Sequence, residues 1–135
     1  MLLLPCGLYT DIVAHCLGGF PDEGCGLLAG NVAGGQVVAC YPTQNMAASA
    51  RLYAVDPKAH LQADRDAEAR GIEIMGVFHS HTHTDAYPSP TDVAQAPDPD
   101  WHYGLVSLRD THPVVRSYRI VQEHVVEEPI VLQAR

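Results

Sequence analysis

Two histidines separated by one residue, His79 and His81, are the side chains of this sequence best placed to do chemistry. If their segment is an extended strand, side chains at positions i and i+2 point to the same face, so both imidazoles can reach one metal ion. A third ligand from a nearby helix start would fill three corners of a tetrahedron and leave the fourth for water, as in a catalytic zinc site. Taken alone the pattern is weak, because with His83 it is also typical of a histidine-rich surface loop.

Asp92 is the candidate third ligand, and it follows Ser89 by three positions. The segment Ser89-Pro90-Thr91-Asp92 has the composition of a helix start, with Ser89 as the N-cap, Pro90 in the first turn and Asp92 as the carboxylate of a capping box. A helix N-terminus also keeps a carboxylate ionised and oriented, which a metal ligand requires. Capping and metal binding are compatible for Ser89, but they compete for the Asp92 side chain.

Glu23 stands in an acidic turn beside Asp22, just before the apolar run Cys25-Gly26-Leu27-Leu28-Ala29-Gly30. A lone glutamate in such a place is most simply a solvated turn residue. Nothing in the local pattern alone assigns it a chemical role.

Three separated segments, in this order, resemble the signature of the JAMM/MPN+ metalloproteases. They are Glu23-x-Cys-Gly-Leu-Leu-x-Gly, His79-Ser80-His81, and Pro88-Ser89-x-x-Asp92. With the Asp56-Pro57 helix start between them, the resemblance covers roughly residues 5–125. The short chain is similar to the stand-alone prokaryotic branch of that family.

The resemblance implies a role for each of these residues. His79, His81 and Asp92 would bind one zinc ion per chain, although the ligand types also suit manganese or iron. Glu23 would act as the general base that accepts the proton of the attacking water. Ser89 would hydrogen-bond the oxyanion. Ser80 is expected to point to the opposite face of the strand.

The resemblance also implies a substrate. JAMM/MPN+ enzymes cleave after the C-terminal glycine of ubiquitin-like proteins, and a stand-alone prokaryotic member suits small ubiquitin-like sulfur-carrier proteins with a Gly-Gly tail. The carrier would be released from a fused protein, a lysine or a cysteine adduct. A thin Gly-Gly tail can lie extended along a strand edge, with the loops at 45–53 and 82–87 as the walls of the groove.

Three other functions are alternatives to this one. A phosphoesterase of the PHP type also carries His-x-His followed by Thr and Asp, as in residues 81–85, but it needs a larger barrel. A zinc deaminase needs His-x-Glu and Pro-Cys-x-x-Cys, which the sequence lacks. A non-catalytic MPN-type binding or scaffold module predicts broken ligands, whereas every ligand is present.

Composition limits the partners further. A length of 135 residues predicts one domain over residues 1–135. The formal net charge of −8 argues against nucleic acid and anionic lipid. No apolar stretch is long enough to span a membrane, and residues 1–5 do not make a signal peptide, so a cytoplasmic location is expected. A homodimer is compatible with the sequence, but no pattern fixes one.

The hydrophobic pattern predicts an α/β (α+β) sandwich with a mixed, mostly antiparallel sheet, two main helices and a short helix at the metal site. The resemblance implies a cytidine-deaminase-like MPN domain. Expected helices cover 7–18, 57–70 and a short segment between Ser89 and Pro97. Expected strands cover 25–30, 36–41, 51–55, 72–79, 101–108 and 114–126, with a last strand or tail at 129–135.

Overall fold

A computed structural model describes residues 1–134 of the chain. One mixed sheet has the strand order β7-β6-β5-β4-β2-β3-β1-β8. The elements in chain order are β1 (Leu2–Pro5), α1 (Cys6–Gly19), β2 (Cys25–Asn31), β3 (Gln36–Thr43), α2 (Pro57–Ala69), β4 (Glu73–His81), α3 (Pro90–Ala94), β5 (His102–Ser107), β6 (Val114–Val121), β7 (His124–Glu128) and β8 (Ile130–Gln133).

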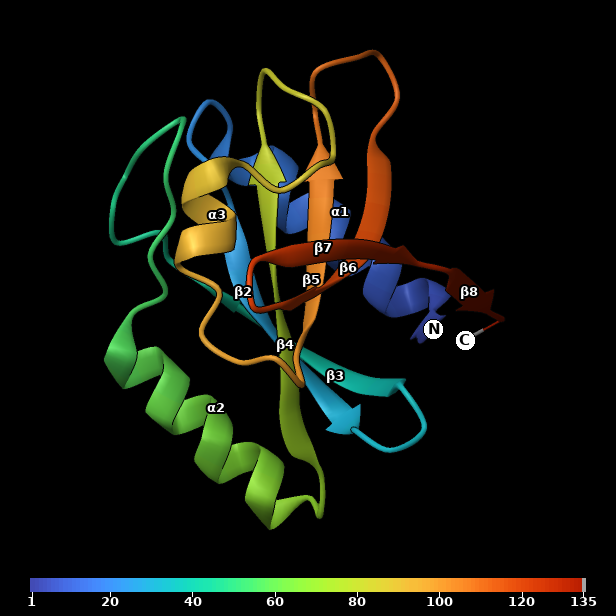
Figure 1. Cartoon of the computed structure of the whole chain (residues 1–135). Helices are drawn as coiled ribbons and strands as arrows, with labels where there is room; N and C mark the ends of the chain where they lie inside the picture. Colours follow the sequence, from blue (N-terminus) through green and yellow to red (C-terminus); the bar gives the residue numbers. More distant parts are fainter. Residues whose placement is uncertain (135) are drawn as a thin grey trace.

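The pairing of the strands confirms the predicted fold class. Neighbouring strands are antiparallel except at β1–β3, β1–β8 and β4–β5, which are parallel. Helix α1 packs on one face of the sheet, against β1, β3, β4 and β8, while α2 packs on β2 and β4 from the other side. Figure 1 shows α2 and α3 on the same side of the central strands. The molecule is therefore a three-layer α/β/α arrangement with β4 near its middle.

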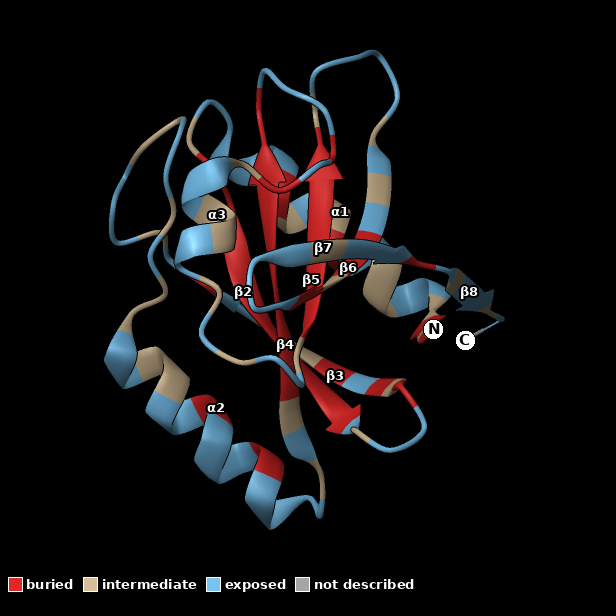
Figure 2. Ribbon diagram, in the orientation of Figure 1, coloured by how far each residue is buried: buried red, intermediate tan, exposed pale blue. Residues whose placement is uncertain are grey.

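Alternation along the central strands separates two hydrophobic clusters. Leu28 and Phe78 pack with α1, whereas their neighbours Leu27 and Val77 pack with Ala63 of α2. Consecutive strand residues point to opposite faces, so a sheet covered on both faces needs apolar residues at successive positions. Figure 2 shows that the buried residues concentrate on the central strands β2, β4 and β5. The strand that carries both histidines is thus held rigidly on each face.

The predicted strand at 51–55 is wrong. This segment is irregular and makes only an isolated bridge between Asn45 and Val55. The Asn45 side chain takes the hydrogen bonds that a ladder would have made, because Oδ1 accepts from Ala54 N at 3.0 Å and Nδ2 donates to Leu52 O at 2.9 Å. Asparagine competes with regular structure in this way.

Other boundaries differ in ways that matter for the site. Strand β4 continues through His81 instead of ending at His79, because Leu108 N donates to His81 O and β5 pairs along its whole end. The segment at 114–126 is a hairpin, with positive φ at Gln122 and Glu123, and not one strand. Strand β1 went unpredicted because its four residues gain their hydrogen bonds from β8 and β3, which are distant in sequence.

Within residues 1–134, no helix has both the length and the apolar character needed to cross a membrane. The cytoplasmic location and the homodimer stay predictions.

Candidate active site and metal centre

The two histidines lie side by side at the C-terminal end of β4. His79 and His81 are 3% and 4% exposed, and their ring centroids are 5.1 Å apart. Between them Ser80 faces the other way, as expected, and its Oγ accepts a hydrogen bond from Gly24 N at 2.8 Å. Strand alternation therefore puts both imidazoles on the α3 face of the sheet and holds them there.

Helix α3 brings Asp92 to the histidines through its cap. Ser89 Oγ accepts from Asp92 N, and Asp92 Oδ2 accepts from Ser89 N at 2.9 Å, which makes a capping box. The same Oδ2 atom lies 3.1 Å from His79 Nε2 and 3.0 Å from His81 Nε2. The expected competition for Asp92 does not arise, because the capping geometry itself aims the carboxylate at the imidazoles.

The donor chemistry of this trio fits a metal ion. One ligand atom from each of His79, His81 and Asp92 lies within 4.8 Å of the others. His81 Nδ1 is 2.8 Å from the carbonyl oxygen of Asp85, which can only accept, so Nδ1 carries the proton. In the neutral ring the Nε2 lone pair then faces the Asp92 carboxylate, another acceptor. A cation between them removes this repulsion, and a ligating histidine that donates through its second nitrogen is the usual arrangement.

The charges of the trio respond to each other. Burial raises the pKa of Asp92, but hydrogen bonds from His79 and His81, when their Nε2 atoms carry protons, outweigh it and hold that pKa well below its usual range. Burial lowers the pKa of His79, which favours the neutral ring that binds a metal. Burial also lowers the pKa of His81, yet bonds to Asp92 and Asp85 shift it upward overall. The site keeps an ionised carboxylate available at neutral pH.

Glu23 is buried, not a solvated turn residue. Its side chain is 4% exposed, and Oε1 has no hydrogen-bond partner among residues 1–134. Desolvation raises the pKa of Glu23 to about 7, with His81 lowering it and Asp92 raising it. A carboxylate poised near neutrality is suited to take and return protons. Its acidic neighbour Asp22 is only half-buried.

Loop residues that the sequence did not single out hold Glu23 in place. Glu23 N donates to Ser49 O at 2.7 Å, and Asn45 Nδ2 donates to Glu23 O at 2.9 Å. Tyr53 stacks on His79 with ring centroids 4.1 Å apart and an interplanar angle of 18°. The segment at 45–53 was expected as a groove wall, with a strand starting at residue 51, and its alanine-rich sequence gave no signal of these contacts.

Two cavities lie along the face of β4 that carries His79 and His81. Val77, His79 and His81 share one face of β4 at i, i+2 spacing, so they follow one another along the strand. At the His81 end lies an open cleft of about 670 Å³. It is lined by Glu23, Ala50, Arg51, His81, Thr82, His83, Thr84 and Ser89. The expected walls at 45–53 and 82–87 therefore do face one another.

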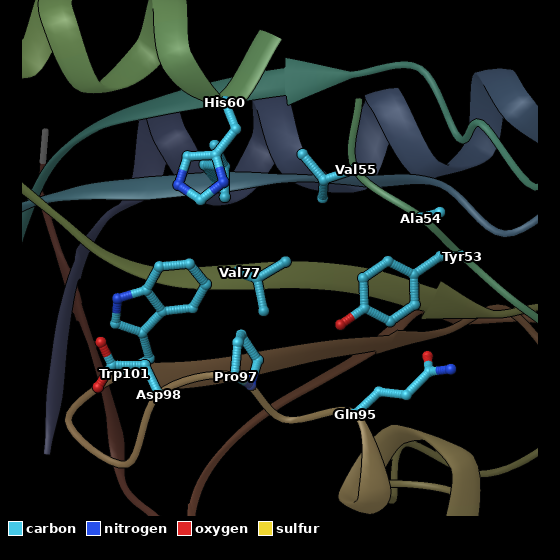
Figure 3. Close-up of a pocket in the computed structure, with 10 residues that line it drawn as sticks. Tyr53, Ala54, Val55, His60, Val77, Gln95, Pro97, Asp98 and Trp101 are labelled. Carbon is cyan, nitrogen blue, oxygen red and sulfur yellow. The ribbon is translucent and has the colours of Figure 1, made fainter. Parts of the chain in front are cut away.

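At the Val77 end lies an apolar pocket of about 400 Å³, which the sequence did not predict. Figure 3 shows Tyr53 at one end of this pocket, with His60 and Trp101 at the other and Val77 on its floor. Trp101 is half-buried and borders the pocket. Tyr53 lines this pocket and also stacks on His79, so the pocket borders the trio through this side chain.

His83 and the nearby Asp85 do not belong to the group formed by His79, His81 and Asp92. His83 lines the cleft but is absent from the metal-ligand group found among residues 1–134. Asp85, the acid of the alternative PHP-type pattern, is exposed and pairs with Arg109 at 2.6 Å. The pattern at 81–85 is therefore not a separate ligand set in the described structure.

Comparisons with known proteins agree with this site. A family model described as prokaryotic homologs of the JAB domain matches residues 5–121. The chain is 41% identical over 131 residues to the CysO-cysteine peptidase of Mycobacterium tuberculosis, covering 96% of this chain and 90% of that protein. It is 36% identical over 97 residues to a probable TtuB-protein conjugate cleaving protease of Thermus thermophilus, covering 71% and 64%. The solution structure of protein DSY2949 from Desulfitobacterium hafniense superposes with a TM-score of 0.91 at 35% identity, covering 100% of this chain and 94% of that one.

The chain belongs to the family of prokaryotic JAB-domain homologs. It is a protease of the JAMM class, which confirms the stand-alone prokaryotic member expected from the sequence. The phosphoesterase, deaminase and non-catalytic alternatives are set aside by this membership.

Proposed function

We propose that the protein is a zinc-dependent peptidase and isopeptidase that cleaves after the Gly-Gly terminus of a small ubiquitin-like sulfur-carrier protein. The carrier is released from a fused protein, a lysine or a cysteine adduct. The observation that carries this proposal is the position of Asp92 Oδ2, 3.1 and 3.0 Å from two imidazole nitrogens, with the buried Glu23 carboxyl in the adjoining cleft. The names of two relatives, which refer to CysO-cysteine and to TtuB-protein conjugates, support a substrate of this kind.

His79, His81 and Asp92 are the residues that would hold the zinc ion. When bound at such a site, zinc lowers the pKa of water and polarises a carbonyl group. Two imidazoles and one carboxylate leave room for a fourth ligand, which distinguishes a catalytic site from a structural one.

The protein's own residues then handle protons and charge. Glu23 accepts the proton of the attacking water and delivers it to the leaving amine, for which a pKa near 7 is favourable. The Ser89 hydroxyl accepts from Asp92 N, so its own hydrogen is not used in that bond and can be donated to the scissile carbonyl oxygen. Tyr53, stacked on His79, excludes water from the apolar side of the site.

The two cavities give the substrate a direction. Glu23 borders the cleft at the His81 end, so the leaving amine belongs there. The carrier tail then occupies the apolar pocket at the Val77 end, where Trp101 and Tyr53 offer apolar contacts, and not the groove between 45–53 and 82–87 in which the sequence had placed it. A tail without side chains at its last two residues passes between Tyr53 and Asp92 most easily.

The proposal is tested with zinc-loaded protein and a ubiquitin-fold carrier that ends in Gly-Gly and is fused to a short peptide. Mass spectrometry should show cleavage after the second glycine, and a matched fusion with Gly-Val at this place should resist. Glu23→Gln should abolish turnover, whereas Glu68→Gln on the exposed side of α2 should not. An intact Gly-Gly fusion, or wild-type turnover in Glu23→Gln, would contradict the proposal.

A further inference from the structure

Arg51 borders the cleft in which the leaving group is proposed to lie, and it has no role in the mechanism proposed above. Arg51 lines the cleft together with Glu23, His81 and Ser89. The chain carries 16 acidic residues against 8 lysines and arginines, so an arginine beside the reacting groups departs from the overall charge. A cation at this place attracts a negative group on the leaving side of the substrate.

The backbone around Arg51 is fixed to both sides of the cleft. Ser49 O accepts from Glu23 N at 2.7 Å, and Ser49 Oγ accepts from Arg51 N at 3.0 Å. On the opposite side, Thr82 Oγ1 donates to Ala50 O at 3.3 Å. Because Thr82 directly follows His81, these bonds set the origin of the arginine side chain relative to both the base and a metal ligand.

The Arg51 guanidinium is available to bind a group of the substrate. Arg70, Arg109 and Arg116 each pair with a carboxylate of the protein, but Arg51 forms no ion pair within residues 1–134. A guanidinium binds a carboxylate through two parallel hydrogen bonds, which gives geometric selectivity as well as attraction. A cleft of about 670 Å³ has ample room for one amino acid, and Arg51 lines it together with the proposed base Glu23.

We propose that Arg51 binds the α-carboxylate of the residue that leaves, so that the enzyme prefers carriers extended by a single C-terminal amino acid. This inference rests on the proposed function and defines the substrate class more narrowly. In the reaction, the C–N bond after the second glycine breaks. Water supplies hydroxyl to the glycine carbonyl carbon and a proton to the amine, which yields the carrier with a free Gly-Gly carboxylate and a free amino acid. In a longer peptide or a conjugate to a protein lysine, the residue next to the scissile bond has no free α-carboxylate.

The test compares two substrates that differ only in this charge. A Gly-Gly carrier joined to one alanine is prepared as the free acid and as the C-terminal amide, and kcat/KM is measured for both with zinc-loaded protein. We expect the acid to be preferred at least tenfold in wild type, mainly through KM. Arg51→Gln should bring the ratio near one, and Arg51→Lys should restore part of it. Arg65→Gln on α2 serves as the control and should keep the wild-type ratio.

The outcomes separate this inference from the function on which it rests. Equal cleavage of acid and amide by wild type overturns the role of Arg51 and leaves the proposed function standing. An unchanged acid-to-amide ratio in Arg51→Gln also overturns it, because the arginine would then act only on the loop structure. Failure of zinc-loaded wild type to cleave either substrate overturns the proposed function and this inference with it.

Discussion

Replacing Glu23 by glutamine is expected to stabilise the metal-free protein at alkaline pH while it removes the general base. Glu23 is 4% exposed, and the pKa of its carboxyl rises from 4.5 to about 7, first because of desolvation. A pKa raised on folding means that the folded state binds the proton more tightly than the unfolded chain. The free energy of unfolding therefore falls as pH rises from about 4.5 to 7, and the whole cost is present above pH 7.

The magnitude follows from the pKa. A rise from 4.5 to about 7 corresponds to about 3 kcal/mol, because one pH unit is worth about 1.4 kcal/mol. Water in the open cleft screens the charge, so we expect about 1–2 kcal/mol at pH 8. At pH 4.5, where most of the folded-state charge is absent, the difference between the two proteins should fall below about 0.5 kcal/mol.

The assay is urea unfolding in the presence of a chelator, followed by circular dichroism at pH 4.5 and at pH 8. Glu68→Gln, at an exposed position of α2, controls for the general effect of removing one negative charge from an acidic protein. If Glu23→Gln is no more stable than wild type at pH 8, or if Glu68→Gln shows the same gain, the desolvation argument for Glu23 is refuted.

Three further predictions concern the framework of the site. Asn45→Ala removes the side-chain bonds to Glu23 O, Leu52 O and Ala54 N, so we expect a loss of about 2–3 kcal/mol in urea unfolding and a tenfold fall in kcat; stability lost with kcat intact would contradict the positioning role. Gly76→Ala would place Cβ 2.2 Å from His102 O, so the melting temperature should fall steeply, whereas Gly34→Ala meets nothing within 4 Å and should be neutral. Glu128→Gln breaks a buried 2.6 Å pair with His102 and should lower the free energy of unfolding by about 3 kcal/mol at pH 7. Burial raises the pKa of Glu128, but its hydrogen-bond partners outweigh burial and lower the pKa to about 2. The stabilisation by Glu128 is therefore present above about pH 4.5 and disappears as pH falls toward 2.

The closeness of His79, His81 and Asp92 followed from local signals, whereas their role as metal ligands was implied by the family resemblance. His79 and His81 need only strand alternation to share a face, and Asp92 needs only the capping box of α3 to point at them. The class of the fold followed from hydrophobic patterning, although β1 was missed and the segment at 51–55 is not a strand. Local sequence rules therefore predicted where these three side chains lie and most of the strands of the sheet.

The features of the site and the fold that were not predicted depend on contacts between segments that are distant in sequence. Glu23 has the local pattern of a solvated turn residue, and its burial comes from the loop carrying Asn45 and Ser49. The predicted strand at 51–55 failed because one asparagine side chain replaced the ladder. The apolar pocket beside Trp101 arises only when α2 and the chain after α3 meet over β4, which no periodicity in the sequence encodes.

The most direct test of the account is zinc content and Gly-Gly fusion cleavage, measured together on wild type, Glu23→Gln and Asp92→Ala. Zinc is quantified by elemental analysis after reconstitution at neutral pH and removal of excess metal. We expect about one zinc per chain in wild type and in Glu23→Gln, with turnover only in wild type, and loss of both zinc and turnover in Asp92→Ala. Stoichiometric zinc in Asp92→Ala, or wild type that cleaves the fusion equally well without any metal, would contradict it.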